Sequence, residues 1–388
     1  MTRLYLTILF SILASFSFAQ KKEIATARDQ VKSGKNLEAA EKSMLKLLDN
    51  PDNKHNEKIY RILNSSIQKQ YEQLNEKIYL KQNVDSVAFF KTLQRAFNHA
   101  YRTDSIIPLE RKNYEPFLQK YLPNLYAGGI YLLRKEKYAD AYELLDTYIE
   151  SRNHPIFANN IPEQRNLNSA AYRALSCGYR LNDFAKIVKH KEQALSFIPG
   201  KSVTLKYLAE TYQKSDSTYS DYVKTLETGF DEYPCEEYFF TRIISYNMNE
   251  RKVEKSLEIA DRAISKCPNN QIYRYTKASI LLNMERYEDC IEAADSTIAI
   301  SKDIADCYYI AGIANVYLAE GLQKKAMKNK TAKQQMQAYY KAALPYFEEY
   351  RKREPNRKDK WGSPLYTIYL NLNKGKEFDE ISKLLKNG

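Results

Sequence analysis

The sequence predicts an all-α fold, an α-solenoid made of stacked antiparallel helix pairs. Two observations predict it. Glycine and proline are scarce, with 11 and 12 among 388 residues, which favours helices over sheets. Three of the prolines, Pro199, Pro234 and Pro268, are 35 and 34 residues apart, and this is the spacing of a repeated helix pair.

The segment 1–19 differs from the rest of the chain. Arg3 gives a short positive region, a mostly apolar run covers 4–16, and the small residue Ala19 ends the segment. This pattern is typical of a cleaved secretory signal, and the apolar run is short for the alternative, a membrane-spanning anchor. We expect a signal peptide over 1–19 and no integral membrane segment after cleavage. Since no cysteine lies near Ala19, we expect an exported periplasmic or cell-envelope protein that is not a lipoprotein.

Residues 20–120 look helical but do not keep the repeat spacing. Leu37, Ala40, Met44 and Leu47 have the spacing of one apolar helix face, which is consistent with a first unit. The stretch 55–120 holds two further helical segments and the start of another. We therefore predict divergent N-terminal helix pairs over 20–120.

From 121 to 388 the repeat is clear. An aromatic residue stands fifteen positions before a proline, with a small residue ten positions after the aromatic, as in Phe184, Ala194 and Pro199. These offsets describe one helix of about four turns and its stop. A second pattern, a tyrosine twelve positions before another aromatic, marks the preceding helix and the turn. These pairs are Tyr126 and Tyr138, Tyr172 and Phe184, Tyr275 and Tyr287, and Tyr366 and Phe378.

One unit of this array is enlarged by a polar, lysine-rich, helix-prone segment near 319–337. We predict a helical insertion there that lengthens both helices of the unit. The stretch 340–355 is then the second helix of that unit, and Pro345 inside it removes a backbone hydrogen bond and predicts a kink. Trp361 is expected in the last loop, and the remaining residues close the array as a charged cap.

The offsets resemble those of the tetratricopeptide repeat (TPR) family, and the chain resembles an exported bacterial TPR-repeat protein. The tryptophan of the family consensus is absent. The resemblance implies a TPR-like right-handed superhelix, in which the first helix of each pair lines a concave groove. The residues that carry the resemblance are Leu125, Gly129, Tyr138 and Ala141; Phe184, Ala194 and Pro199; Ala278, Leu281, Tyr287 and Ala294; and Ala311, Gly312, Tyr340, Ala343, Phe347 and Pro355.

In the groove implied by the resemblance, Tyr and Arg side chains recur. Such residues supply large contact areas and hydrogen-bond donors at binding surfaces. We interpret them as a ladder for an extended peptide or a helix; the other interpretation is that the tyrosines pack against the adjacent helix. The groove candidates are Tyr126, Arg134, Tyr172, Tyr179, Arg180, Tyr275, Tyr309, Tyr317 and Tyr366.

Patterns that carry catalysis or metal binding are missing from the sequence. The four histidines are scattered, and His190, between Lys189 and Lys191, is expected to be solvated within a helix. The five cysteines are odd in number and lack a C-x-x-C spacing, which argues against a disulfide framework or zinc site. For Cys235 and Cys267, beside two of the spaced prolines, a disulfide and buried thiols both stay open.

The formal net charge is +12, and residues 319–388 hold 16 Lys and Arg against 8 Asp and Glu. A basic surface suits an acidic partner, an anionic membrane or nucleic acid, and export disfavours nucleic acid. We expect that the protein is not an enzyme and binds no cofactor. We expect it to be a protein–protein interaction scaffold or adaptor of the bacterial cell envelope, with a partner that the sequence does not identify. The alternative is an envelope glycan-binding protein, which needs exposed aromatics clustered at one place; here they are spread along the chain.

Overall fold

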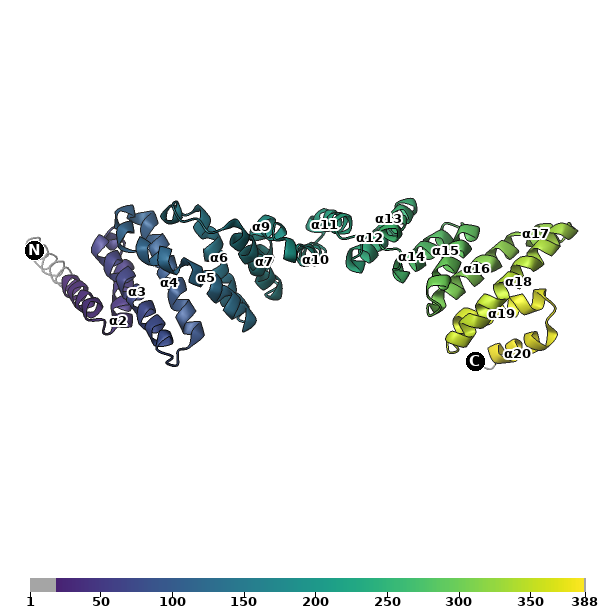
Figure 1. Ribbon diagram of the computed structural model, residues 1–388, viewed down its shortest axis with the longest axis horizontal. Coiled ribbons are helices and arrows are strands. Elements are labelled where there is room, and N and C mark those ends of the chain that lie inside the picture. Colours follow the sequence, from purple (N-terminus) through teal and green to yellow (C-terminus); the bar gives the residue numbers. More distant parts are fainter. Residues whose placement is uncertain (1–18, 387–388) are drawn as a thin grey trace, which may run out of the picture. The chain divides into compact units, whose positions relative to one another are not determined.

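The computed structural model describes residues 19–386, and these residues form helices joined by short turns, without a strand (Figure 1). The predicted all-α fold is therefore confirmed. The chain divides into two compact units, and the boundary after Thr211 falls inside α10 (Lys201–Tyr212). Within each unit, successive helices pack side by side as an α-solenoid of helix pairs. None of the helices in the described range is both long and apolar enough to cross a membrane.

The first unit begins with a helix over residues 19–33 and ends in α10. Its divergent part, 55–120, consists of one helix pair and the start of another helix. The other helices of this unit are α2 (Leu37–Leu48), α3 (Glu57–Tyr79), α4 (Ser86–Ile106), α5 (Glu115–Arg134), α6 (Tyr138–Glu150), α7 (Gln164–Arg180), α8 (Phe184–Lys189) and α9 (Lys191–Leu195). Short 3₁₀ turns lie at Pro51–Asn53, Pro108–Asn113, Ser151–Asn153, Pro155–Phe157 and Ile198–Gly200.

The second unit starts at Tyr212 and contains the enlarged pair. The insertion near 319–337 spans the end of α16, all of α17 and the start of α18, and α18 continues through Pro345. The helices of this unit, after a 3₁₀ turn at Asp216–Thr218, are α11 (Tyr219–Glu232), α12 (Glu237–Asn249), α13 (Val253–Lys266), α14 (Gln271–Asn283), α15 (Tyr287–Ile300), α16 (Ala305–Gly321), α17 (Gln323–Ala326), α18 (Lys330–Arg353), α19 (Lys358–Asn371) and α20 (Gly375–Lys386).

Small residues in the first helix of a pair set how closely the second helix approaches. A Cβ added to Gly129 would lie 2.5 Å from Cγ of Leu145, and one added to Gly312 would lie 2.8 Å from Cε2 of Phe347. Leu145 and Phe347 are fully buried. A larger residue at either glycine therefore requires the partner helix to move.

The turn between the two helices of a pair has the same geometry in both units. One residue adopts a left-handed backbone conformation, and the N–H that follows it bonds to a carbonyl five residues earlier, which is a Schellman motif. After α14, for example, Arg286 N donates to the Leu281 carbonyl at 3.0 Å. The left-handed residues at these turns, with φ of 52–57°, are Lys81, Glu136, Asn182, Arg251, Glu285 and Asn373.

Two of the prolines that predicted the period lie directly after helices of the second unit. α11 ends at Glu232 before Pro234, and α13 ends at Lys266 before Pro268. Cys235 and Cys267 form a disulfide there, with their Cα atoms 5.8 Å apart. The sequence left open whether these two cysteines are buried thiols or a disulfide, and the structure contains the disulfide.

The prediction that Trp361 lies in a loop is wrong. Trp361 is the fourth residue of α19 and is 3% exposed, because its ring fills the space beneath the end of α18. Its indole N–H donates to the Glu354 carbonyl at 3.1 Å, and the Arg351 guanidinium lies 4.9 Å from the ring centre. The residue is therefore part of the core of the last two pairs.

Candidate functional site

The predicted groove tyrosine of α5 joins three helices. The Tyr126 ring is half-buried and stacks on Tyr148 of α6, with ring centres 5.3 Å apart. Its hydroxyl lies 2.8 Å from the Ser169 hydroxyl of α7. Tyr126 therefore packs its own pair together and links that pair to the next.

The two groove tyrosines of α7 are also engaged inside the first unit. Tyr172 stacks on Phe197 at 5.3 Å between ring centres, and Tyr179 stacks on Tyr207 at 3.9 Å. The Tyr179 hydroxyl donates to the Glu210 carboxylate, and this hydrogen bond, with burial, raises the pKa of Tyr179 to about 12. The arginine candidates of this unit, Arg134 and Arg180, are exposed.

Of the groove candidates in the second unit, two side chains are packed against the core and two are exposed to solvent. Tyr275 and Tyr309 are half-buried against the hydrophobic cluster between α14, α15 and α16. Tyr317 and Tyr366 are 42% and 36% exposed. Each still touches one ring, Tyr287 at 5.5 Å and Phe378 at 4.7 Å.

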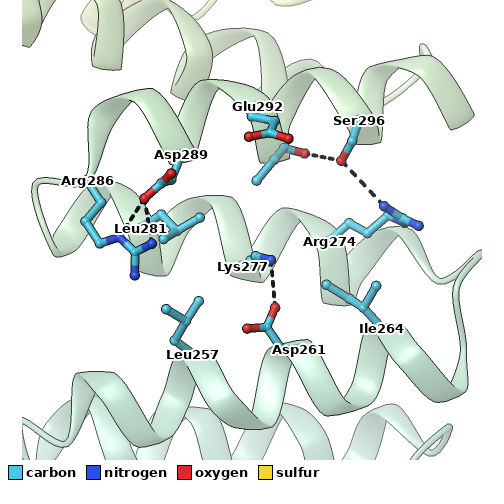
Figure 2. A pocket seen from close by; sticks show the side chains of 11 residues that line it. Leu257, Asp261, Ile264, Arg274, Lys277, Leu281, Arg286, Asp289, Glu292 and Ser296 are labelled. Carbon is cyan, nitrogen blue, oxygen red and sulfur yellow. Dashed lines mark hydrogen bonds and ion pairs between the residues drawn. The ribbon is translucent and has the colours of Figure 1, made fainter.

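A cleft that the sequence did not predict lies between α13, α14 and α15 (Figure 2). Its volume is about 300 Å³. α13 and α14 supply its apolar floor through Leu257, Ile264 and Leu281. None of the nine predicted groove residues lines this cleft.

The cleft exists because α14 directs two long charged side chains at a junction between helix pairs. Arg274 and Lys277 precede the small residue Ala278, which is buried, and both line the opening in place of bulky apolar groups. Their stems cover apolar surface while their charged ends stay in contact with water. The space between the pairs therefore stays open.

Only some of the charged side chains around the cleft form ion pairs. Lys277 pairs with Asp261 at 2.7 Å, and Arg286 pairs with Asp289 at 2.6 Å. Arg274 donates to the Pro268 carbonyl at 2.7 Å and to the Ser296 hydroxyl at 3.4 Å, but it meets no carboxylate in the described part of the chain.

On the opposite wall of the cleft, Glu292 forms no hydrogen bond or ion pair with any residue that the structure describes. Arg274 and Glu292 thus offer one positive and one negative group beside an apolar floor. The sequence signal for this site was the pair of basic residues just before Ala278, but its acidic wall comes from another helix.

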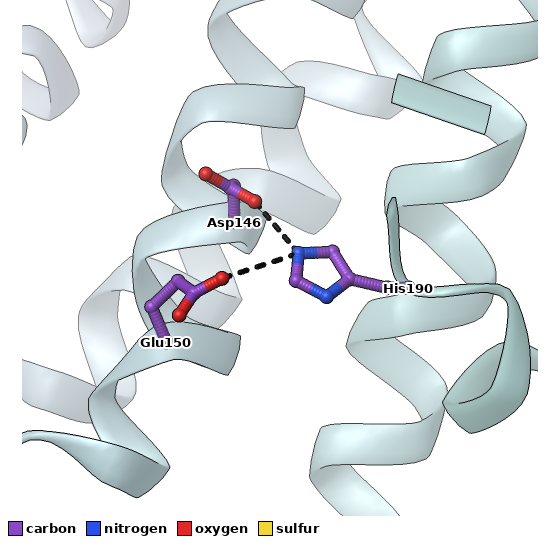
Figure 3. A group of neighbouring side chains, drawn as sticks. All are labelled: Asp146, Glu150 and His190. Carbon is purple, nitrogen blue, oxygen red and sulfur yellow. Dashed lines mark hydrogen bonds and ion pairs between the residues drawn. The ribbon is translucent and has the colours of Figure 1, made fainter. Parts of the chain in front are cut away.

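The expectation that His190 is solvated within a helix is wrong. His190 lies at the break between α8 and α9, and its side chain is 9% exposed. Its Nε2 lies 2.7 Å from Asp146 Oδ1 and 4.0 Å from Glu150 Oε1 (Figure 3). The ring is held there because α6 presents two carboxylates one turn apart toward this break.

Asp146, Glu150 and His190 are residue types that can bind a metal ion, but Lys189 already forms ion pairs with both carboxylates. Lys189 Nζ lies 2.7 Å from Asp146 and 3.2 Å from Glu150. Burial acts to raise the pKa of Asp146, yet the hydrogen bonds from His190 and Lys189 outweigh it and hold that pKa below its usual value. The group therefore joins α6 to the α8–α9 break as an ion-pair network.

The same turn recurs at the interval of the helix pairs. Arg251 and Glu285 close the same Schellman turn in two consecutive pairs, at the same interval that separates Pro234 from Pro268. The helices that follow these two turns, α13 and α15, are both 14 residues long. The chain is therefore an α-solenoid of repeated helix pairs. No family model and no curated protein matches it.

Several solved structures of TPR proteins are similar to this chain at low sequence identity. The C-terminal part of a TPR protein from Cytophaga hutchinsonii is 16% identical, with 66% of this chain and 93% of that chain covered and a TM-score of 0.42. YrrB, described as a TPR protein with an unusual peptide-binding site, is 13% identical, with 56% and 95% covered and a TM-score of 0.34. The TPR2AB domain of yeast Sti1, solved in complex with pHSP90, is 13% identical, with 80% and 98% covered and a TM-score of 0.29.

Proposed function

We propose that this protein is a non-enzymatic interaction scaffold or adaptor of the bacterial cell envelope, which binds a peptide or helix of a partner protein. The observation that carries the proposal is the cleft between α13, α14 and α15, with its apolar floor and its unmatched Arg274 and Glu292. A partner segment fits if it places an apolar side chain on the floor between one acidic and one basic residue. Specificity then comes from charge placement, and affinity from the apolar contact.

The chemistry of the cleft suits recognition. Lys277 and Asp261, and likewise Arg286 and Asp289, neutralise each other as ion pairs. Such pairs position a ligand and reject one with the wrong charge order. The cleft also lies in the wall of a rigid helix stack, so little ordering is needed on binding.

Two exposed tyrosines of the second unit are further candidates for contact with the partner. Tyr317 and Tyr366 keep more than a third of their surface exposed, whereas Tyr275 and Tyr309 are committed to packing. In the first unit, Arg134 and Arg180 are the exposed members of the predicted groove. We assign partner contact to these exposed residues, and we assign the packed tyrosines to shaping the surface.

Location in the envelope rests on two features. The pattern over residues 1–19, which lies outside the described residues apart from Ala19, is that of a secretory signal. The disulfide between Cys235 and Cys267 suits an oxidising compartment. Both features support export of the mature chain.

Site-specific photo-crosslinking tests the proposed function. A photoreactive phenylalanine analogue is placed at Leu257 on the floor of the cleft, at the exposed residue Tyr317, and at the exposed control position Lys302. We expect one partner protein to be cross-linked from 257 through a single segment, and the product to disappear when Arg274→Glu is added. The same products from position 302, or none from 257 and 317, would overturn the proposal. A cross-linked glycan would replace it with the glycan-binding alternative.

A further inference from the structure

We propose that the lysine-rich end of the α16–α18 pair is a docking surface for an anionic lipid bilayer. We call this end the lysine tip; it consists of Lys324, Lys325, Met327, Lys328, Lys330 and Lys333. The inference concerns a partner different from the protein segment proposed above and does not depend on it.

The lysine tip is an unmatched positive surface. From Gly321 to Lys341 the chain has six lysines and no acidic residue. All five lysines of the tip are exposed, and none takes part in an ion pair within the part of the chain that the structure describes. A surface without its own counter-charges attracts an external anion over about a Debye length.

The tip presents an apolar group among these charges. Met327 is 80% exposed, more than any other large apolar side chain described in the second unit. Met327 follows α17 directly, and Figure 1 shows α17 at the outer end of the α16–α18 pair. A flexible apolar side chain ringed by lysines can enter the headgroup region while the ammonium groups bind lipid phosphates.

The backbone of the tip is held in place. Asn329 caps α18, since its side-chain oxygen accepts hydrogen bonds from Thr331 N at 2.8 Å and Ala332 N at 3.3 Å. The reversal between Lys328 and Lys330 is therefore fixed, and exposed lysines lie on both sides of it in the chain. Little conformational freedom is therefore lost when this surface binds a membrane.

The side-chain types favour a membrane over nucleic acid. The tip has lysines and no arginine, so it offers point charges instead of the bidentate fork that recognises individual phosphates. Residues 321–338 contain no aromatic side chain on which a base could stack. A diffuse negative surface such as a phosphatidylglycerol-containing leaflet fits this composition best.

Binding of purified protein, residues 20–388, to lipid vesicles tests the proposal. Vesicles of phosphatidylcholine with phosphatidylglycerol as the minor component are compared with vesicles of phosphatidylcholine alone, by co-sedimentation at low and high salt. The test variant carries Lys324→Gln, Lys325→Gln and Lys328→Gln. The control variant has the same charge change at exposed lysines elsewhere in the second unit, with Lys224→Gln, Lys302→Gln and Lys376→Gln.

We expect binding to the anionic vesicles only, weakened by salt, and lowered on the order of 100-fold in the test variant, since each lysine near the surface contributes about 1 kcal/mol. Met327→Ser should weaken the same binding several-fold with the charge unchanged. Equal losses in test and control variants, binding that ignores phosphatidylglycerol, or no binding by the native chain would overturn the proposal. Tighter binding of a single-stranded RNA oligonucleotide than of the vesicles would overturn it in favour of nucleic acid.

Discussion

Replacing Gly312 by alanine should separate α16 from α18. A Cβ at this position would lie 2.8 Å from Cε2 and 2.9 Å from Cδ2 of Phe347, whose side chain is fully buried. Overpacking of this kind lowers the unfolding free energy by about 1–3 kcal/mol, while the higher helix propensity of alanine raises it by up to about 1 kcal/mol. We expect a net loss of unfolding free energy.

Gly321 on the same helix is the matched control. Nothing lies within 4 Å of a Cβ added there, so Gly321→Ala should leave stability unchanged or raise it by up to about 1 kcal/mol. The two variants should differ by about 2 kcal/mol, which for a unit of this size separates their melting temperatures by about 4–8 °C. Thermal unfolding followed by circular dichroism measures this. Equal melting temperatures, or a more stable Gly312→Ala variant, would refute the close-approach role of the glycine.

Three further predictions concern stability. Cys235→Ser opens a disulfide that joins residues 32 apart, and should lower the unfolding free energy by about 3–4 kcal/mol in chemical denaturation; an oxidised and a reduced native chain of equal stability would contradict this. Hydrogen bonds from Arg61 hold the pKa of Glu110 below its usual value, so their stabilisation is complete above the unfolded pKa and is lost as pH falls through the folded one. Glu110→Gln should therefore cost about 1 kcal/mol at pH 7 and progressively less as the pH falls through the folded pKa of Glu110, and a cost independent of pH would contradict the linkage. Tyr126→Phe removes the 2.8 Å hydrogen bond to Ser169 but keeps the ring stack, and should cost about 1 kcal/mol in the same denaturation assay; a loss well above that would mean that the hydroxyl does more than bond Ser169.

The helix pairs were predictable because their signals are local. Pro234 and Pro268 mark the ends of two helices, and Gly129 and Gly312 mark where a second helix approaches. The Schellman turns were not predicted at Glu136, Arg251 and Glu285, since these residue types do not favour a left-handed backbone. Hydrogen bonds at the ends of the flanking helices hold them in this conformation.

The sites were harder to predict because they combine distant segments. A tyrosine such as Tyr172 looks like a binding residue until its stacking partner, Phe197, is known from the fold. The cleft needs charges from both α14 and α15, and the His190 network needs two carboxylates from α6, which is separated from His190 by the whole of α7 and α8. Residue type and spacing carry no information about which of these segments meet.

The affinity of a partner segment for charge-reversed variants decides whether the cleft between α13, α14 and α15 recognises its partner by charge. The segment cross-linked from position 257 is made as a peptide, with a second version in which its acidic and basic residues are exchanged. We expect the double substitution Arg274→Glu with Glu292→Lys to lower the affinity for the natural peptide at least about tenfold, and the exchanged peptide to recover most of that loss. Unchanged affinity for the natural peptide, or an equal loss for both peptides, would contradict recognition through this cleft.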